Sequence, residues 1–142
     1  PIADRGHHEI SVSLVPHAGS WRYAGIVQQA ASFNQPLLAR VIKPGHKAST
    51  TKVEEFKPTL TGGAAAHILI AGMKNAVAGK GRVVRIYEAA GQAGSVSLQG
   101  LPADAEVFLT NPLEEQAQPL PIANGEVALS FRAWEVKTIL VK

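Results

Sequence analysis

The stretch that decides the fold reads RVVRIYEA, over residues 82–89. Val84 and Ile86 fall on one side of an alternating pattern, and Arg85 and Tyr87 fall on the other. Successive side chains of a β-strand point to opposite faces, so this period of two places one pair against a core and the other toward solvent. We therefore predict a half-buried strand here.

Short segments of similar character recur on both sides, at intervals of about ten residues. The run 67–73 is apolar apart from its first residue, which is typical of a strand covered on both faces. Asn124-Gly125 predicts a hairpin turn, because both positions tolerate positive φ. The other predicted strands cover residues 8–15, 56–60, 96–98, 106–109, 127–131 and 136–141. This spacing predicts a β-sandwich rather than a parallel α/β sheet.

One helix is predicted, from Trp21 to Phe33. Ile26 and Ala30 recur at helical spacing, and the hydroxyl of Ser20 can accept an amide of the first turn. A polar loop follows at about residues 39–52. The fold class is therefore mainly β, a β-sandwich with one embedded α-helix near Trp21–Phe33. It forms a single domain over residues 1–142.

The composition is that of an ordinary soluble protein. Of 142 residues, 46% are hydrophobic and 18% charged, which excludes a disordered chain. No apolar run reaches the roughly 18 residues of a membrane span. The net charge of +3 is spread singly along the chain, whereas nucleic-acid binders concentrate charge on one face. We expect a soluble protein with no nucleic-acid or membrane partner and favour the cytoplasm. A first strand so close to Pro1 indicates a piece of a larger protein.

Metal and phosphate sites are not predicted within this chain. A zinc site needs three or four convergent ligands, and the five histidines show no such spacing. His67 lies in the apolar run and is interpreted as a core histidine. The segment Gly79-Lys80-Gly81-Arg82 superficially resembles a phosphate cradle, but a strand rather than a helix follows it. A β-turn is the better interpretation.

Three groups of residues carry a resemblance to a known family. The first is DRGxHEI at 4–10, followed by SLVPHAGxW at 13–21 and FNQPL at 33–37. The second is ILIAGMK at 68–74 with RVVRIYE at 82–88, and the third is TNPLEE at 110–115 with WEVKTIL at 134–140. In order and spacing they resemble the C-terminal β-domain region of glycoside hydrolase family 38 α-mannosidases. The resemblance covers nearly the whole chain and is most specific from Asp4 to Trp21.

The resemblance implies a β-sandwich of the supersandwich, galactose-mutarotase-like type. It also implies a parent enzyme that hydrolyses terminal α-mannosides with retention. In such enzymes a preceding catalytic domain holds the zinc, the nucleophilic Asp and the acid/base Asp. The C-terminal domains pack on it and form part of the sugar-cleft wall. The expected partners are therefore the catalytic domain of the same enzyme and α-mannosides. No cofactor is expected in this chain.

The resemblance further implies that Asp4, Arg5 and Gly6 reach toward the sugar, as a substrate-binding segment. Arg5 suits this role because its planar fork can bind two hydroxyls or a carboxylate. A structural salt bridge of Arg5 with Asp4 or Glu9 is the alternative. The chain departs from the family pattern at residues 75–79, where the family tends to carry an acidic residue in the turn. It departs again in the first strand, where Ile10 and Val15 replace preferred aromatics.

A catalytic role for this chain itself is not predicted. A glycosidase needs two carboxyl groups facing each other across the scissile bond. The adjacent pairs Glu54-Glu55 and Glu114-Glu115 would diverge in an extended strand and are interpreted as solvated surface. Glu88 and Glu135 could orient a neighbour, but the sequence shows no partner for either. The catalytic set is therefore predicted to be absent.

Two other functions stay open. An autonomous carbohydrate-binding β-sandwich module would expose a flat aromatic platform. A purely structural interaction domain would leave a large apolar face exposed without its partner. Trp21 and Trp134 are the largest candidates for stacking on sugars, but their positions favour core anchors.

Overall fold

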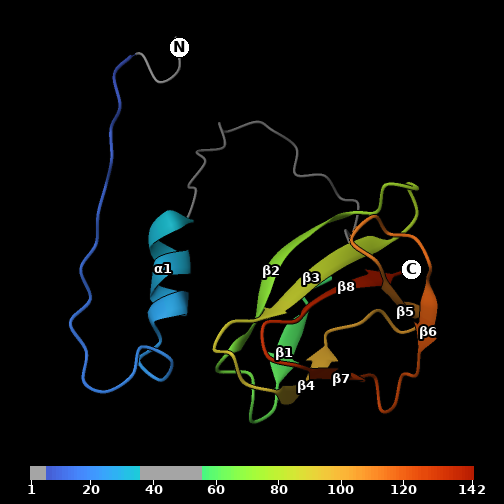
Figure 1. Ribbon diagram of the computed structural model, residues 1–142. Coiled ribbons are helices and arrows are strands. Elements are labelled where there is room, and N and C mark those ends of the chain that lie inside the picture. Colours follow the sequence, from blue (N-terminus) through green and yellow to red (C-terminus); the bar gives the residue numbers. More distant parts are fainter. Residues whose placement is uncertain (1–5, 36–55) are drawn as a thin grey trace, which may run out of the picture. The chain divides into compact units, whose positions relative to one another are not determined.

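A computed structural model describes residues 6–35 and 56–142 (Figure 1). The chain divides into two compact units, Pro1–Val41 and Ile42–Lys142, which are described separately below. Among the described residues, the first unit contains one helix and the second contains eight strands. The predicted single domain over 1–142 stays a prediction. The predicted polar loop at 39–52 lies outside the described residues.

The strands of the second unit form two antiparallel sheets. One sheet has three strands in the order β1-β4-β7, and the other has five in the order β2-β3-β8-β5-β6. This mainly β architecture with one short helix confirms the predicted fold class. The strands are β1 Thr59–Thr61, β2 Ile68–Asn75, β3 Arg82–Glu88, β4 Gly94–Gln99, β5 Val107–Thr110, β6 Gln118–Leu120, β7 Val127–Phe131 and β8 Val136–Val141.

The core lies between the two sheets and uses the alternating positions of their strands. In β3 the side chains of Val84 and Ile86 are fully buried, whereas Arg85 between them is exposed, as the sequence predicts. Burying a side chain of this size stabilises the fold by roughly 1.5–3 kcal/mol. The same cluster contains Ile68, Val96, Leu98, Val107, Val127, Leu129, Phe131, Ile139 and Val141.

Three connections between the sheets lie at one end of the sandwich. Residues 62–67 lead from β1 to β2, residues 89–93 from β3 to β4, and residues 132–135 from β7 to β8. The antiparallel registers bring them together, because Glu88 at the end of β3 is opposite Ile68 at the start of β2, and Tyr87 is opposite Val136 at the start of β8. Side chains from all three connections can therefore meet.

Two predictions about strands are wrong: the burial of β2 and the presence of a strand at 8–15. β2 is not covered on both faces, because it is the edge strand of its sheet and is exposed from Ala71 onward, where a bulge shifts its register. The segment 8–15 forms no strand, and Ile10, Val12 and Leu14 are 82%, 78% and 90% exposed. A strand needs a neighbour to take its backbone hydrogen bonds, and the described residues provide none for this segment.

The helix begins later than predicted. α1 spans Ile26–Asn34, and residues 21–25 form turns instead. Gly25 precedes the helix in the left-handed conformation, at φ 67°, which interrupts a continuous helix from Trp21. Ser20 Oγ accepts the amide of Arg22 at 3.4 Å, so it stabilises the turn and does not cap α1.

The hairpin turn is confirmed, and the chain also turns before β3, although its hydrogen-bonded β-turn spans residues 76–79 rather than 79–82. Asn124 and Gly125 both have positive φ, and the flanking residues Ala123 and Glu126 exchange two backbone hydrogen bonds. Gly79 donates to the carbonyl of Ala76 in a β-turn before β3. Strand β6 was not predicted, because it is short and contains Pro119 at its centre.

Two glycines of the second unit provide a matched test of local packing. Gly100 and Gly125 have nearly the same φ, 80° and 77°, but a Cβ at Gly100 would collide with the carbonyl oxygen of Lys57 while one at Gly125 would meet open space. We expect Gly125→Ala to lower the free energy of unfolding by about 1 kcal/mol and Gly100→Ala by clearly more, because only the second adds a steric clash. Urea unfolding measures both. Equal losses would contradict the described approach of Lys57.

Candidate functional site

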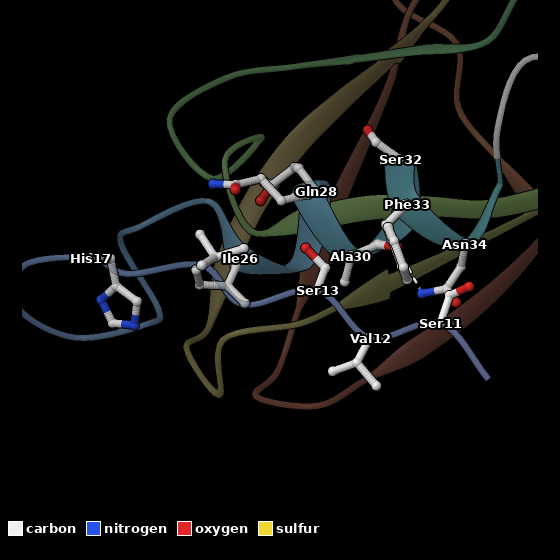
Figure 2. A pocket seen from close by; sticks show the side chains of 12 residues that line it. Ser11, Val12, Ser13, His17, Ile26, Gln28, Ala30, Ser32, Phe33 and Asn34 are labelled. Atoms are coloured by element: carbon white, nitrogen blue, oxygen red, sulfur yellow. Dashed lines mark hydrogen bonds between the residues drawn. The ribbon is translucent and has the colours of Figure 1, made fainter.

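A cavity in the first unit lies between residues 11–17 and α1. It measures about 770 Å³, and its wall combines apolar side chains with neutral polar ones (Figure 2). Asn34 Nδ2 donates to the carbonyl oxygen of Ala30 at 2.8 Å, which fixes one end of the wall. The polar lining consists of Ser11, Ser13, His17, Gln28, Gln29, Ser32 and Asn34. No carboxylate belongs to this lining.

The predicted substrate-binding segment precedes this cavity in the sequence. Asp4 and Arg5 lie outside the described residues. Gly6 is described, and it is exposed at φ 138° with open space around the position of a Cβ. Their role in binding sugar stays a prediction.

The strongest cluster of polar contacts lies in the second unit and is centred on Glu88. Its side chain is fully buried at the end of β3. The carboxylate accepts the backbone amides of Ala90 at 2.6 Å, Gly91 at 2.8 Å and Trp134 at 2.8 Å. Nδ1 of His67 lies 2.9 Å from Oε1, and it acts as the donor because an ionised carboxylate can only accept. Glu88 therefore binds all three connections at this end of the sandwich.

These contacts determine the protonation of Glu88. Burial alone raises its pKa, but the hydrogen bonds from Trp134, Ala90, His67 and Gln92 outweigh it and lower the pKa from 4.5 to about 2. Hydrogen bonds that favour the charged form have this effect on a carboxyl group. Glu88 is thus an ionised structural anchor at neutral pH. The sequence shows no partner for Glu88, and the structure supplies His67 and three backbone amides.

Trp134 is the most exposed part of this cluster. It is 59% exposed, so its interpretation as a core anchor is wrong, and Trp21 at 39% is not a core residue either. The backbone of Trp134 is left-handed, at φ 63°. The indole lies against Gly91, where a Cβ would come within 2.6 Å of Cζ2.

Two other carboxylates form ion pairs in the second unit. Glu114 pairs with Lys74 and accepts the amide of Val77 at 2.7 Å, which lowers its pKa, first through the Lys74 hydrogen bond. Its side chain is only 8% exposed, so its interpretation as solvated surface is wrong. Glu135 accepts the amide of Arg132 at 2.7 Å, the main cause of its lowered pKa, and contacts Lys137 at 3.2 Å.

The arrangement does not fit a metal site. Within residues 6–35 and 56–142, no three His, Cys, Asp or Glu side chains are placed to hold an ion. A zinc ion needs at least three such ligands. What the described residues do provide is a rigid anchor, a polar cavity and an exposed aromatic ring.

Comparison with known proteins gives the family. Residues 67–139 match the family described as the glycosyl hydrolases family 38 C-terminal beta sandwich domain. This match covers the sandwich from the start of β2 into β8. The chain belongs to this family. The resemblance read from the sequence is thereby confirmed.

Full-length relatives extend the comparison beyond the family 38 sandwich domain. Alpha-mannosidase 2C1 of Homo sapiens is 31% identical over 145 residues, and that of Mus musculus is 29% identical over 141 residues. Each alignment includes 98% of this chain, and the chain spans 13% of the length of either relative. The similarity therefore includes the first unit, which lies outside the family match.

Removal of the Glu88 charge tests the anchor in this family 38 domain. A folded pKa below the unfolded value of 4.5 stabilises the protein above that pH, and the stabilisation is lost as pH falls toward about 2. We expect Glu88→Gln to lower the free energy of unfolding at pH 7 by about 3 kcal/mol and to flatten its decline between these pH values.

Urea unfolding as a function of pH measures this effect, with the exposed Glu115→Gln as the matched control. Equal pH dependence in the wild type and Glu88→Gln would show that the carboxylate does not anchor the connections.

Proposed function

We propose that this chain is a non-catalytic C-terminal domain of an α-mannosidase, which packs on the catalytic domain of the same polypeptide and contributes to the wall of its sugar cleft. The observation that carries the proposal is the family match over residues 67–139. The relatives named alpha-mannosidase 2C1 align with almost the whole chain, and they are several times longer than it is.

The state of three described carboxyl groups supports a non-catalytic role. A glycosidase uses one carboxylic acid that keeps its proton near neutral pH, and this requires a raised pKa. Glu88, Glu114 and Glu135 all have lowered pKa values, because each carboxylate accepts backbone amides and contacts a His, Lys or Arg side chain. Such groups stabilise the fold and are poor proton donors.

The chemistry of the parent enzyme is part of the same proposal. We expect retaining hydrolysis of terminal α-mannosides with zinc in the catalytic domain. The described residues offer no set of three metal ligands, so no step of that reaction is assigned to them. Their part is to hold the sandwich against the catalytic domain.

The exposed apolar side chains support packing on another part of the polypeptide. Large exposed apolar surfaces in isolated domains mark interaction sites. In the second unit such side chains occur at Met73, Val77, Leu113, Ile122 and Val136. In the first unit Ile10, Val12, Leu14 and Tyr23 are exposed by 78% or more.

The segment Asp4-Arg5-Gly6 remains the proposed contact with sugar. In this proposal Arg5 hydrogen-bonds hydroxyl groups of the mannoside. For the localisation, we keep the cytoplasm as an expectation. No helix among the described residues is long and apolar enough to cross a membrane.

Hydrolysis assays test the division of labour. The purified 142-residue chain is expected to release no product from an aryl α-mannoside, with or without added zinc, because it lacks the catalytic groups. The longer polypeptide, including the residues encoded upstream of Pro1, is expected to be active and to lose activity when residues 1–142 are deleted. Zinc-dependent turnover by the 142-residue chain, or full activity of the deletion variant, would contradict the proposal.

A further inference from the structure

Trp134 is held in an unusual backbone conformation at the surface. It lies in the connection between β7 and β8, at φ 63°, and its residue surface is 59% exposed. A bulky residue in the left-handed region is rare, and such outliers persist where the surroundings impose them. Here the buried carboxylate of Glu88 accepts the Trp134 amide at 2.8 Å. The backbone is fixed although more than half of the residue surface is exposed.

One face of the indole is supported by Gly91. A Cβ at Gly91 would lie 2.6 Å from Cζ2, 2.8 Å from Cε2 and 3.1 Å from Nε1. Cε2 is a ring-fusion atom, and an approach in the plane of the ring would meet its neighbours Cζ2 and Nε1 first. Because the Cβ position would be nearly as close to Cε2 as to Cζ2, Gly91 lies over the face of the ring rather than at its edge. Gly91 is itself fixed, since its amide donates to Glu88 at 2.8 Å. The indole face therefore packs against a fixed stretch of backbone, while the residue as a whole is 59% exposed.

The other tryptophan differs in this respect. The guanidinium of Arg22 lies 5.1 Å from the centre of the Trp21 ring and covers it as a cation–π partner. Within the described part of the chain, no Lys or Arg lies over the Trp134 ring in this way. Trp134 is 59% exposed and is not covered by such a cation, and Trp21 provides an internal comparison.

From this geometry we propose that Trp134 is a platform that binds a hexopyranose ring by stacking. The negative face of an indole attracts the weakly positive C–H groups on the apolar side of a sugar ring. Charged groups close to Trp134 in the sequence can bind the hydroxyls: Arg132 has an 88% exposed side chain, and Glu135 follows Trp134 directly.

A sugar suits this surface better than a protein anchor. Cores of protein interfaces are depleted in charged residues, whereas Arg132, Glu135 and Lys137 surround Trp134 in the sequence and form ion pairs of 3.5 Å and 3.2 Å. The platform goes beyond the accessory role proposed above. It requires neither the catalytic domain nor Asp4 to Gly6, so either idea can fail without the other.

The test is a titration of the 142-residue chain with α-mannobiose, followed by ¹⁵N NMR at the two indole N–H groups. We expect saturable shifts of the Trp134 resonance and none of the Trp21 resonance. Trp134→Ala should weaken binding about tenfold or more, as removal of a central aromatic contact does. Gly91→Ala should weaken it too, because the new methyl group displaces the ring while leaving it in the protein.

Trp21→Ala and Val136→Ala are the matched controls, since each removes an exposed apolar side chain without touching the platform. Both should bind as the wild type does, and thermal unfolding of every variant checks that it is folded. Absence of saturable binding by the wild type, or unchanged binding by Trp134→Ala, would overturn the inference. So would a wild type that binds no sugar but uses Trp134 to bind the separately supplied catalytic region.

Discussion

The buried carboxylate of Glu88 joins three connections that lie far apart in the sequence. It accepts hydrogen bonds from the backbone amides of Ala90, Gly91 and Trp134 and from the imidazole of His67. These groups belong to the β1–β2, β3–β4 and β7–β8 connections, each of which crosses from one sheet to the other. An uncompensated buried charge would be strongly destabilising, so the four contacts and the charge require one another. The orientation of Trp134 and Gly91 depends on this one group.

Much of this sandwich could be predicted because alternation is a local property. Strands β3, β7 and β8 follow from period-two patterns that a few residues determine. The burial of β2 was overestimated because the strand lies at the edge of its sheet. That position depends on which strands pair, and the residues of β2 alone do not determine the pairing. The same reason explains the absent strand at 8–15. The late start of α1 depends on the left-handed Gly25, and glycine in a sequence does not specify that conformation.

The candidate site could have been found in part. Glu88 occupies the same side of the alternation as Val84 and Ile86, so a carboxylate at a core position was visible in the sequence. Its partners were not, because the amide of Trp134 is 46 residues away and His67 is 21 residues away. A buried charge without a visible partner is therefore a useful signal of a long-range contact in β-sandwiches.

The physical character of the carboxylates also connects the fold to the proposed division of labour. Carboxylates that bind backbone amides and cationic side chains stabilise loops. The same contacts lower their pKa, whereas acid catalysis needs a carboxyl group with a raised pKa. A domain of this kind can form a firm support beside a sugar cleft while catalysis occurs elsewhere. The described residues also leave a cavity beside α1 and an exposed tryptophan at residue 134.

Hydrogen exchange at individual amides tests the role of Glu88 most directly. If the carboxylate anchors the three connections, the amides of Ala90, Gly91 and Trp134 exchange as slowly as those in the centre of β3 and β8, through global unfolding. Exchange of these three amides at the rate of exposed loops, with β3 and β8 still protected, would contradict the account.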